Sequence, residues 1–104
     1  QSNKFESVDV ATFAKVIADT TVVLLDVRTP EEYEEAHIGN AINIDVLQDN
    51  FESKAISILP KDKKIALYCR SGKRSKKAAN ILAAKGYKII ELNTGYLGWI
   101  EAKK

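Results

Sequence analysis

One short segment of the chain gathers most of the side chains that could do chemistry. Its seven residues are Cys69, Arg70, Ser71, Gly72, Lys73, Arg74 and Ser75. The segment follows the apolar run 65–68 and leads into a helical pattern, and backbone N–H groups at a helix start can converge on a bound anion. A reactive sulfur beside an anion-binding turn is therefore the first chemistry that the sequence predicts.

The surroundings of Cys69 favour its thiolate form. Three cations, Arg70, Lys73 and Arg74, lie within five residues of the sulfur, and the helix that follows adds a partial positive charge. Both influences lower the pKa of a thiol, whose ordinary value is about 8.5. Most lone cysteines are small buried hydrophobic residues, but positive charge at a helix N-terminus is unfavourable unless an anion binds there. We therefore predict that Cys69 is a nucleophile.

Two small residues complete this turn. Gly72 permits the backbone reversal that a tight anion cradle requires. Ser75 is expected to cap the helix that follows, because a serine hydroxyl accepts hydrogen bonds from the first N–H groups of a helix.

The hydrophobic pattern indicates the elements that position this turn. Continuous apolar runs at 22–25 and 65–68 are typical of parallel strands covered on both faces, and 88–92, 41–44 and a weak stretch at 5–8 are further candidates. Helices are predicted over 10–17, from Pro30 after the cap Thr29, over 45–58 and over 75–85, with Gly86 as a stop. This alternation predicts an α/β domain with a mainly parallel sheet.

Length and composition limit the kinds of protein to which the chain could belong. With 104 residues, 45% hydrophobic and 29% charged, the sequence is expected to form one domain over residues 1–104. A net charge of +2 and the lack of an apolar run of about 18 residues argue against nucleic acid and membrane as partners. A single cysteine excludes an internal disulfide. Because no methionine is present, we expect that an initiator or leader was removed, which leaves a cytoplasmic or, after leader removal, a periplasmic location open.

Four segments, in this order, resemble the rhodanese (sulfurtransferase) family in its single-domain form. They are 25–33 (LDVRTPEEY), 37–44 (HIGNAINI), the cysteine turn and 92–99 (LNTGYLGW). The last departs from the family's closing pattern at Thr94, where a glycine is usual, and this puts a local turn in doubt. The resemblance covers nearly the whole chain, and four ordered motifs are far more specific than one.

The resemblance implies a fold and a reaction. The fold would be a three-layer α/β/α rhodanese-like domain with a five-stranded parallel sheet. Cys69 would take a sulfane sulfur as a persulfide, cradled by the amides of 70–74, from a small anionic donor such as thiosulfate. The acceptor would be cyanide, a thiol or a protein cysteine, with no metal or organic cofactor and a monomer as the default state.

Three residues outside the turn receive supporting roles. Asp26 follows the strand at 22–25, so it could pair with Arg74 or Arg28 at the mouth of the site, or be a surface acid. Arg28 is expected to be structural and to pair with Glu32 or Glu34. His37, the only histidine, is expected to hydrogen-bond the backbone rather than to form a protease-like dyad with Cys69.

Two other functions stay open at this point. Dual-specificity phosphatases and arsenate reductases of a related fold surround a tetrahedral oxyanion with the longer loop C-x5-R, whereas this chain has Cys69-x4-Arg74. The shorter loop suits a single sulfur atom better than a phosphate. The second alternative is a sulfur carrier or binding module that acts with a protein partner.

Overall fold

Five short strands form one parallel sheet in the order β1-β5-β4-β2-β3. The computed structural model describes residues 5–103. The strands are β1 (Glu6–Val8), β2 (Val23–Asp26), β3 (Ile42–Asn43), β4 (Ile65–Tyr68) and β5 (Ile89–Leu92). The five predicted strands are confirmed, and the strand that precedes Cys69 lies at the centre of the sheet.

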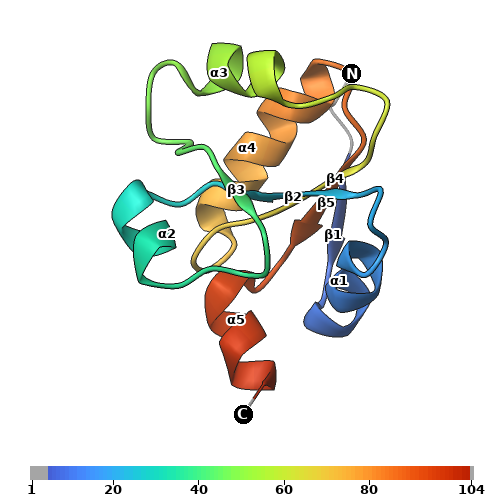
Figure 1. Ribbon diagram of the computed structural model, residues 1–104, viewed down its shortest axis with the longest axis vertical. Helices are drawn as coiled ribbons and strands as arrows, with labels where there is room; N and C mark the ends of the chain where they lie inside the picture. The colour runs from blue at the N-terminus through green and yellow to red at the C-terminus, as the bar shows by residue number, and fades with distance from the viewer. Residues whose placement is uncertain (1–4, 104) are drawn as a thin grey trace.

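The helices cover both faces of this sheet. They are α1 (Val10–Ile17), α2 (Pro30–Glu35), α3 (Phe51–Ile58), α4 (Lys73–Ala84) and α5 (Gly95–Ala102). Figure 1 shows α3 and α4 on one side of the sheet and α1, α2 and α5 on the other. The predicted three-layer α/β/α arrangement is therefore confirmed. Within residues 5–103, no helix has the length and apolar character needed to cross a membrane.

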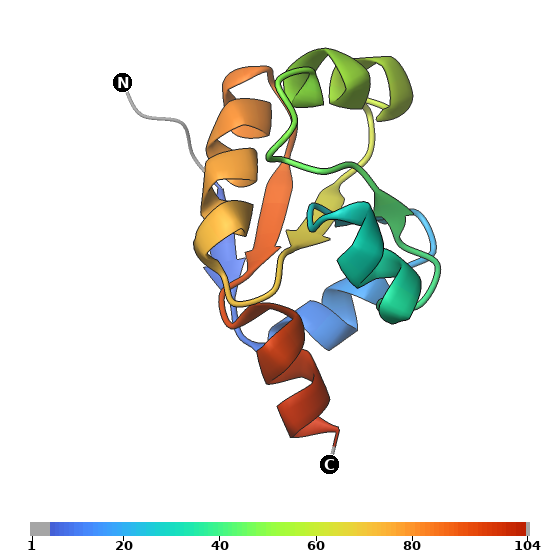
Figure 2. The same ribbon diagram turned by 90° about the vertical axis from the view of Figure 1, so that its left-hand side faces the viewer.

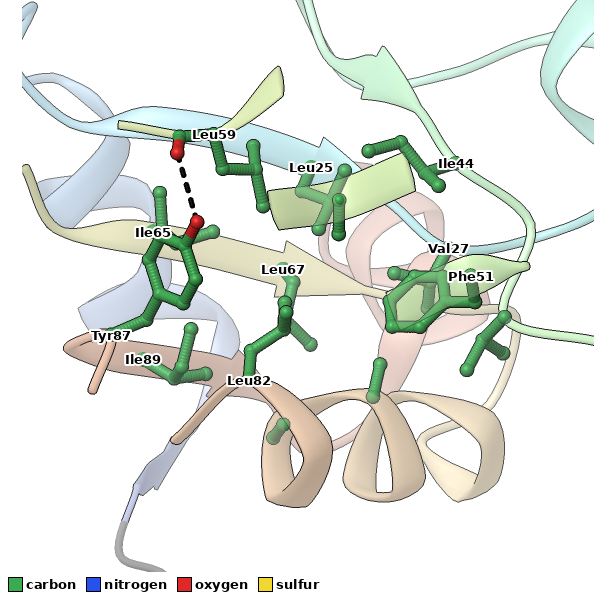
Figure 3. Close-up of a cluster of buried hydrophobic side chains, with 14 of the residues drawn as sticks. Leu25, Val27, Ile44, Phe51, Leu59, Ile65, Leu67, Leu82, Tyr87 and Ile89 are labelled. Atoms are coloured by element: carbon green, nitrogen blue, oxygen red, sulfur yellow. Dashed lines mark hydrogen bonds between the residues drawn. The ribbon is translucent and has the colours of Figure 1, made fainter. Parts of the chain in front are cut away.

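The continuous apolar runs are explained by burial on both faces. Neighbouring strand residues point to opposite faces, so Leu67 packs in the α3/α4 layer whereas Tyr68 packs against Phe13 in the other layer. Figure 3 shows part of the first layer, in which the Tyr87 hydroxyl donates to the Leu59 carbonyl at 2.9 Å. Both faces of β4 are therefore fixed by packing, and its carboxyl end is held rigidly.

The helix predicted over 45–58 was too long at its start. Residues 45–50 form turns, and α3 begins at Phe51. The Asp45 carboxylate accepts a hydrogen bond from the Leu47 N–H at 2.9 Å, which stabilises a turn in place of the first helical turn. This geometry lets Val46 and Phe51 enter the core, and both are at least 97% buried.

The helix after Cys69 begins two residues earlier than predicted. α4 starts at Lys73, and Gly72 is its N-cap with a φ of 105°, so the predicted side-chain cap at Ser75 is wrong. A Cβ atom at residue 72 would collide with the Asn93 carbonyl oxygen. Gly72 is thus required both for the left-handed backbone and for the close approach of the β5–α5 connection.

Candidate active site

Cys69 lies where β4 ends and the turn to α4 begins. Its side chain is buried, with 1% of the residue exposed, and the Gly72 N–H donates to its Sγ at 3.1 Å. The carboxyl ends of parallel strands are where ligands of α/β proteins bind. The sulfur is thus held at the first turn of a helix, at the edge of the sheet where a reaction site is expected.

Hydrogen bonds stabilise the thiolate of Cys69. Burial raises the pKa of this thiol, but the Ser75 hydroxyl and the N–H groups of Ser75, Gly72 and Ser71 outweigh burial and bring the pKa below its ordinary value. The direction agrees with the sequence-based expectation, but its main cause differs. The donors that converge on the sulfur are amides and one hydroxyl, rather than the three cationic side chains.

The start of α5 holds the cysteine turn in place. The N–H groups of Tyr96 and Leu97 donate to the carbonyls of Cys69 and Arg70 at 2.8 and 3.0 Å. Figure 2 shows this contact between the β4–α4 turn and the first turn of α5. Gly95 has a φ of 66°, and a Cβ there would lie 2.5 Å from the Arg70 carbonyl oxygen. Two segments about 25 residues apart in the chain thus form one rigid unit.

Arg74 is directed toward α2 rather than toward the sulfur. Its guanidinium forms two hydrogen bonds with the Glu32 carboxylate, at 2.8 and 3.0 Å. Glu32 also accepts from the Thr29 N–H as part of the capping box of α2. The hydrogen bond from Arg74 is the main reason that the pKa of Glu32 falls to about 2. The suggested pairing of Arg74 with Asp26 is therefore wrong.

Asp26 and Arg28 form a buried ion pair beneath the site. Their closest N–O distance is 2.7 Å, and they are 0% and 4% exposed. Arg28 also donates to the Ala36 carbonyl at 2.6 Å and lies over the Tyr96 ring at 4.5 Å. Asp26 is thus not a surface acid. The suggested pairing of Asp26 with Arg28 is confirmed, and the expected structural role of Arg28 fits this geometry. The pairing of Arg28 with Glu32 or Glu34 is wrong.

The remaining residues of the turn face outward. Arg70, Ser71 and Lys73 are exposed. Arg70 borders a hollow of about 210 Å³, which Tyr96 and Leu97 of α5 also line. The hollow lies beside the cysteine turn, and both arginine and glutamate side chains line it, namely Arg28, Glu32 and Glu35 in addition to Arg70.

His37 has the backbone role that was expected. Its Nδ1 lies 2.9 Å from the Tyr33 carbonyl oxygen, and its exposed ring stacks on the Tyr33 ring with centroids 3.9 Å apart. The imidazole is therefore engaged with α2 in the turn that leads to β3.

Sequence reasoning missed one residue close to the turn. Glu91 lies within β5, is 0% exposed and accepts a hydrogen bond from the Ser75 hydroxyl at 2.5 Å. The signal was present, because a carboxylate interrupts the apolar run 89–92 at a position that a parallel sheet buries.

Fold and site together define a class of protein. A buried cysteine at the end of a central parallel strand, surrounded by hydrogen-bond donors at a helix N-terminus, is a thiolate site that can accept an anionic group. The family model described as "Rhodanese-like domain" matches residues 9–102. The chain belongs to the rhodanese-like domain family.

Relatives and a solved structure agree with this assignment. A "Sulfurtransferase" of Allochromatium vinosum is 33% identical and is matched over 88% of this chain and 85% of its own length. "Thiosulfate sulfurtransferase PspE" of Escherichia coli is 38% identical over 70% of this chain and 68% of its own length. A crystal structure of a rhodanese-related protein from Thermoplasma volcanium has a TM-score of 0.82 and 33% identity, covering 94% of this chain and 93% of that one.

Several relatives carry names other than sulfurtransferase, among them a "tRNA uridine(34) hydroxylase" of Pelagibacter ubique, 31% identical over 97% of this chain and 34% of that protein. The chain is 34% identical to "Protein HIGH ARSENIC CONTENT 1, mitochondrial" of Arabidopsis thaliana, with 93% of this chain and 63% of that protein covered. The relatives named as sulfurtransferases support a general sulfurtransferase role and a rhodanese-type enzyme.

Proposed function

We propose that the protein moves a sulfane sulfur from a small anionic donor, such as thiosulfate, to a thiophilic acceptor through a persulfide on Cys69. The observation that carries this proposal is the convergence of donors on one sulfur atom, with the Gly72 N–H 3.1 Å from Sγ. These donors stabilise a thiolate at Cys69, which is the nucleophile that such a transfer needs.

The proposed first step is balanced in charge and needs no proton transfer. The Cys69 thiolate attacks the outer sulfur of thiosulfate, a bond forms between Sγ and that sulfur, and sulfite leaves with the electron pair of the broken S–S bond. The negative charge then lies on the terminal sulfur of the persulfide. In the second step cyanide, a thiolate or a protein cysteine attacks this terminal sulfur and restores the Cys69 thiolate.

The charges of the turn favour an anionic donor. Arg70 and Lys73 are exposed at the outer side of the turn, where their charges attract an anion and offset its repulsion by the thiolate. The N–H groups of 70–74 lie at the N-terminus of α4 and stabilise negative charge in the same way as an oxyanion hole. Arg74 acts indirectly, since its guanidinium is paired with Glu32.

The geometry of the cysteine loop supports sulfur transfer rather than phosphate ester hydrolysis as the reaction. The loop Cys69-x4-Arg74 is one residue shorter than C-x5-R, and its amides point at the cysteine sulfur itself. An arginine engaged with Glu32 is also not directed at a position where a phosphate would be held above the sulfur.

Mass spectrometry after incubation with thiosulfate tests the proposal. The wild type should gain about 32 Da on Cys69, the mass of one sulfur, and lose it on addition of cyanide. The Cys69→Ser variant is the matched control and should gain nothing. Thiosulfate turnover and para-nitrophenyl phosphate hydrolysis are measured in parallel. Faster hydrolysis of the phosphate ester than transfer of sulfur would overturn the assignment.

A further inference from the structure

The hollow beside the cysteine turn has no part in the transfer steps described above. Its volume is about 210 Å³, and residues of α2 and α5 line it. Pockets that enclose a drug-sized ligand have volumes of about 300–1,000 Å³. This hollow can therefore hold one residue of a longer chain, whose remainder stays outside.

One hydrogen-bond donor of Arg28 is free at this hollow. The guanidinium donates to Asp26 through Nε and Nη2, and to the Ala36 carbonyl through Nη2 at 2.6 Å. Within residues 5–103, Nη1 has no hydrogen-bond partner, and no fully buried side-chain nitrogen or oxygen lacks one. Nη1 is therefore accessible. Because Arg28 and its neighbours Ala36 and Tyr96 all line the hollow, the free donor faces into it.

The position of this donor is fixed by the surrounding side chains. Arg28 is 4% exposed, its ion pair with Asp26 has an N–O distance of 2.7 Å, and its guanidinium lies over the Tyr96 ring at 4.5 Å. A group that is already held in place loses little freedom when a ligand binds to it. Nη1 is thus a preorganised donor.

The charges around the hollow balance one another. Two of the four charged residues that line it, Arg28 and Glu32, are each neutralised by an ion pair. The other two, Arg70 and Glu35, are exposed and opposite in sign. The two carboxylates would repel an anion. A neutral acceptor, such as a peptide carbonyl, therefore suits Nη1 better than an anion does.

One wall of the hollow is apolar. Leu97 and Ile100 lie about one turn apart on α5 and are 40% and 39% exposed. Neither belongs to the buried clusters or to the side chains packed against them. An aliphatic side chain that covered them would remove apolar surface from water, which is favourable.

We propose that the hollow binds a segment of a protein that accepts the sulfur. A main-chain carbonyl of this segment accepts a hydrogen bond from Arg28 Nη1, and an aliphatic side chain packs on Leu97 and Ile100. Arg70 and Glu35 favour an acidic residue on one side of the aliphatic residue and a basic residue on the other. The inference rests on the proposed function for the partner's role as a sulfur acceptor.

The wall of the hollow is attached to the cysteine turn. The N–H groups of Tyr96 and Leu97 donate to the carbonyls of Cys69 and Arg70, so a segment bound in the hollow is held beside the turn. A cysteine thiolate of the partner then bonds to the terminal sulfur of the persulfide. The bond between that sulfur and Sγ breaks, and Cys69 leaves with the electron pair as a thiolate.

Nuclear magnetic resonance tests binding without any sulfur transfer. The probe is N-acetyl-leucine methylamide, which is uncharged and combines peptide carbonyls with an aliphatic side chain. It should shift the amide signals of Arg70 and of residues 96–100 in the resting protein. Ile100→Ser should weaken this binding by roughly threefold. Ile56→Ser is the matched control, because Ile56 is 41% exposed on α3, in the opposite layer.

Arg28→Lys tests the donor. A lysine keeps the positive charge beside Asp26 but has no group in the place of Nη1, so the probe should bind roughly fivefold more weakly. If this variant does not fold, Ile100→Ser still provides the test.

Peptide acceptors test the hollow in transfer. In each capped peptide, zero to three glycines separate a cysteine from a leucine, and a control series has serine in place of leucine. The persulfide protein should transfer sulfur to the best leucine peptide roughly fivefold faster than to its serine counterpart. This ratio should fall in Ile100→Ser. Rates in each variant are expressed relative to transfer to cyanide, which is too small to span the hollow and the sulfur.

Three results would overturn this inference: equal losses of binding in Ile100→Ser and Ile56→Ser, unchanged binding in a folded Arg28→Lys, or no preference for leucine at any spacing. Stronger binding of butyrate than of the neutral probe would also overturn it, since the hollow would then be an anion site. A wild type that takes no sulfur from thiosulfate would overturn the proposed function instead. The binding measurement on the resting protein would still decide whether the hollow holds a peptide.

Discussion

The Arg74 guanidinium and the Glu32 carboxylate form a two-point ion pair, with N–O distances of 2.8 and 3.0 Å, between residues 42 positions apart in the chain. Both side chains are about one-quarter exposed. The pair joins the first turn of α4 to the first turn of α2, so it connects the cysteine turn to the layer on the other side of the sheet.

Breaking this pair should loosen the cysteine turn. We expect Arg74→Ala to lower the free energy of unfolding by about 1–2 kcal/mol. It should also raise the pKa of Cys69, because the Arg74 charge interacts with the thiolate, and slow thiosulfate turnover. Denaturant unfolding and thiolate absorbance measure the two effects.

The exposed pair of Lys85 and Glu52 provides a control, since its N–O distance is 3.0 Å but its side chains are 44% and 48% exposed. Lys85→Ala should cost less than about 0.5 kcal/mol. Equal stability losses for the arginine and lysine variants, together with an unchanged thiol titration, would contradict the role given to Arg74.

The Glu32 carboxylate makes stability depend on pH in a defined window. Its pKa is about 2 in the folded protein and about 4.5 without these interactions, chiefly because of the bond from Arg74. The stabilisation is therefore fully present above about pH 4.5 and is lost as the pH falls toward 2. Wild type and Glu32→Gln should differ most in unfolding free energy near neutral pH and converge toward pH 2. A difference that grows on acidification would show that the sign is wrong.

Gly95 is predicted to be intolerant of any side chain. In Gly95→Ala, the Cβ would meet the Arg70 carbonyl 2.5 Å away, so α5 must shift away from the cysteine turn. We expect a loss of about 2–4 kcal/mol in stability and a large loss of turnover.

Gly86→Ala is the matched control for this close approach. Gly86 also has a positive φ, 95°, but no atom lies within 4 Å of the position that a Cβ would take there. Only backbone strain of about 1 kcal/mol is expected at this residue. If both alanine variants lost the same stability and kept full turnover, the α5 contact would not support the site.

The exposed Arg70 side chain should affect the binding of the anionic substrate. Arg70→Ala is expected to raise KM for thiosulfate by roughly fivefold, the equivalent of about 1 kcal/mol, with little change in kcat. The effect should shrink at high salt, because exposed charges are screened. Lys63→Ala, at the opposite end of β4, is the control of equal charge. Steady-state kinetics at two ionic strengths would reveal a kcat effect if Arg70 acted on chemistry instead.

The parts of the fold that could be predicted are those with a local signal. Apolar runs located the strands, and Thr29 followed by Pro30 located the start of α2, where Thr29 is the N-cap as predicted. The start of α3 could not be located, because the Asp45 carboxylate forms a turn inside a segment that also fits a helical pattern.

In the candidate site, the central residues could be predicted from the sequence, but most ion-pair and hydrogen-bond partners of the surrounding side chains could not. Cys69 and Gly72 were identified because their types and order are unusual. Arg28 was one of two partners suggested for Asp26, but the pairing of Arg74 with Glu32 was not predicted, since the chain offers several carboxylates and only packing selects among them. Glu91 was overlooked although its position in an apolar strand indicated a buried charge, which always requires partners.

The hydrogen bonds from Tyr96 and Leu97 to the cysteine turn also have a consequence during synthesis. A ribosome makes the chain from its N-terminus, so β4, the turn and α4 leave the exit tunnel before α5 does. Until then the carbonyls of Cys69 and Arg70 lack these donors. The cysteine turn of the nascent protein should therefore become fixed in its final geometry only when α5 docks.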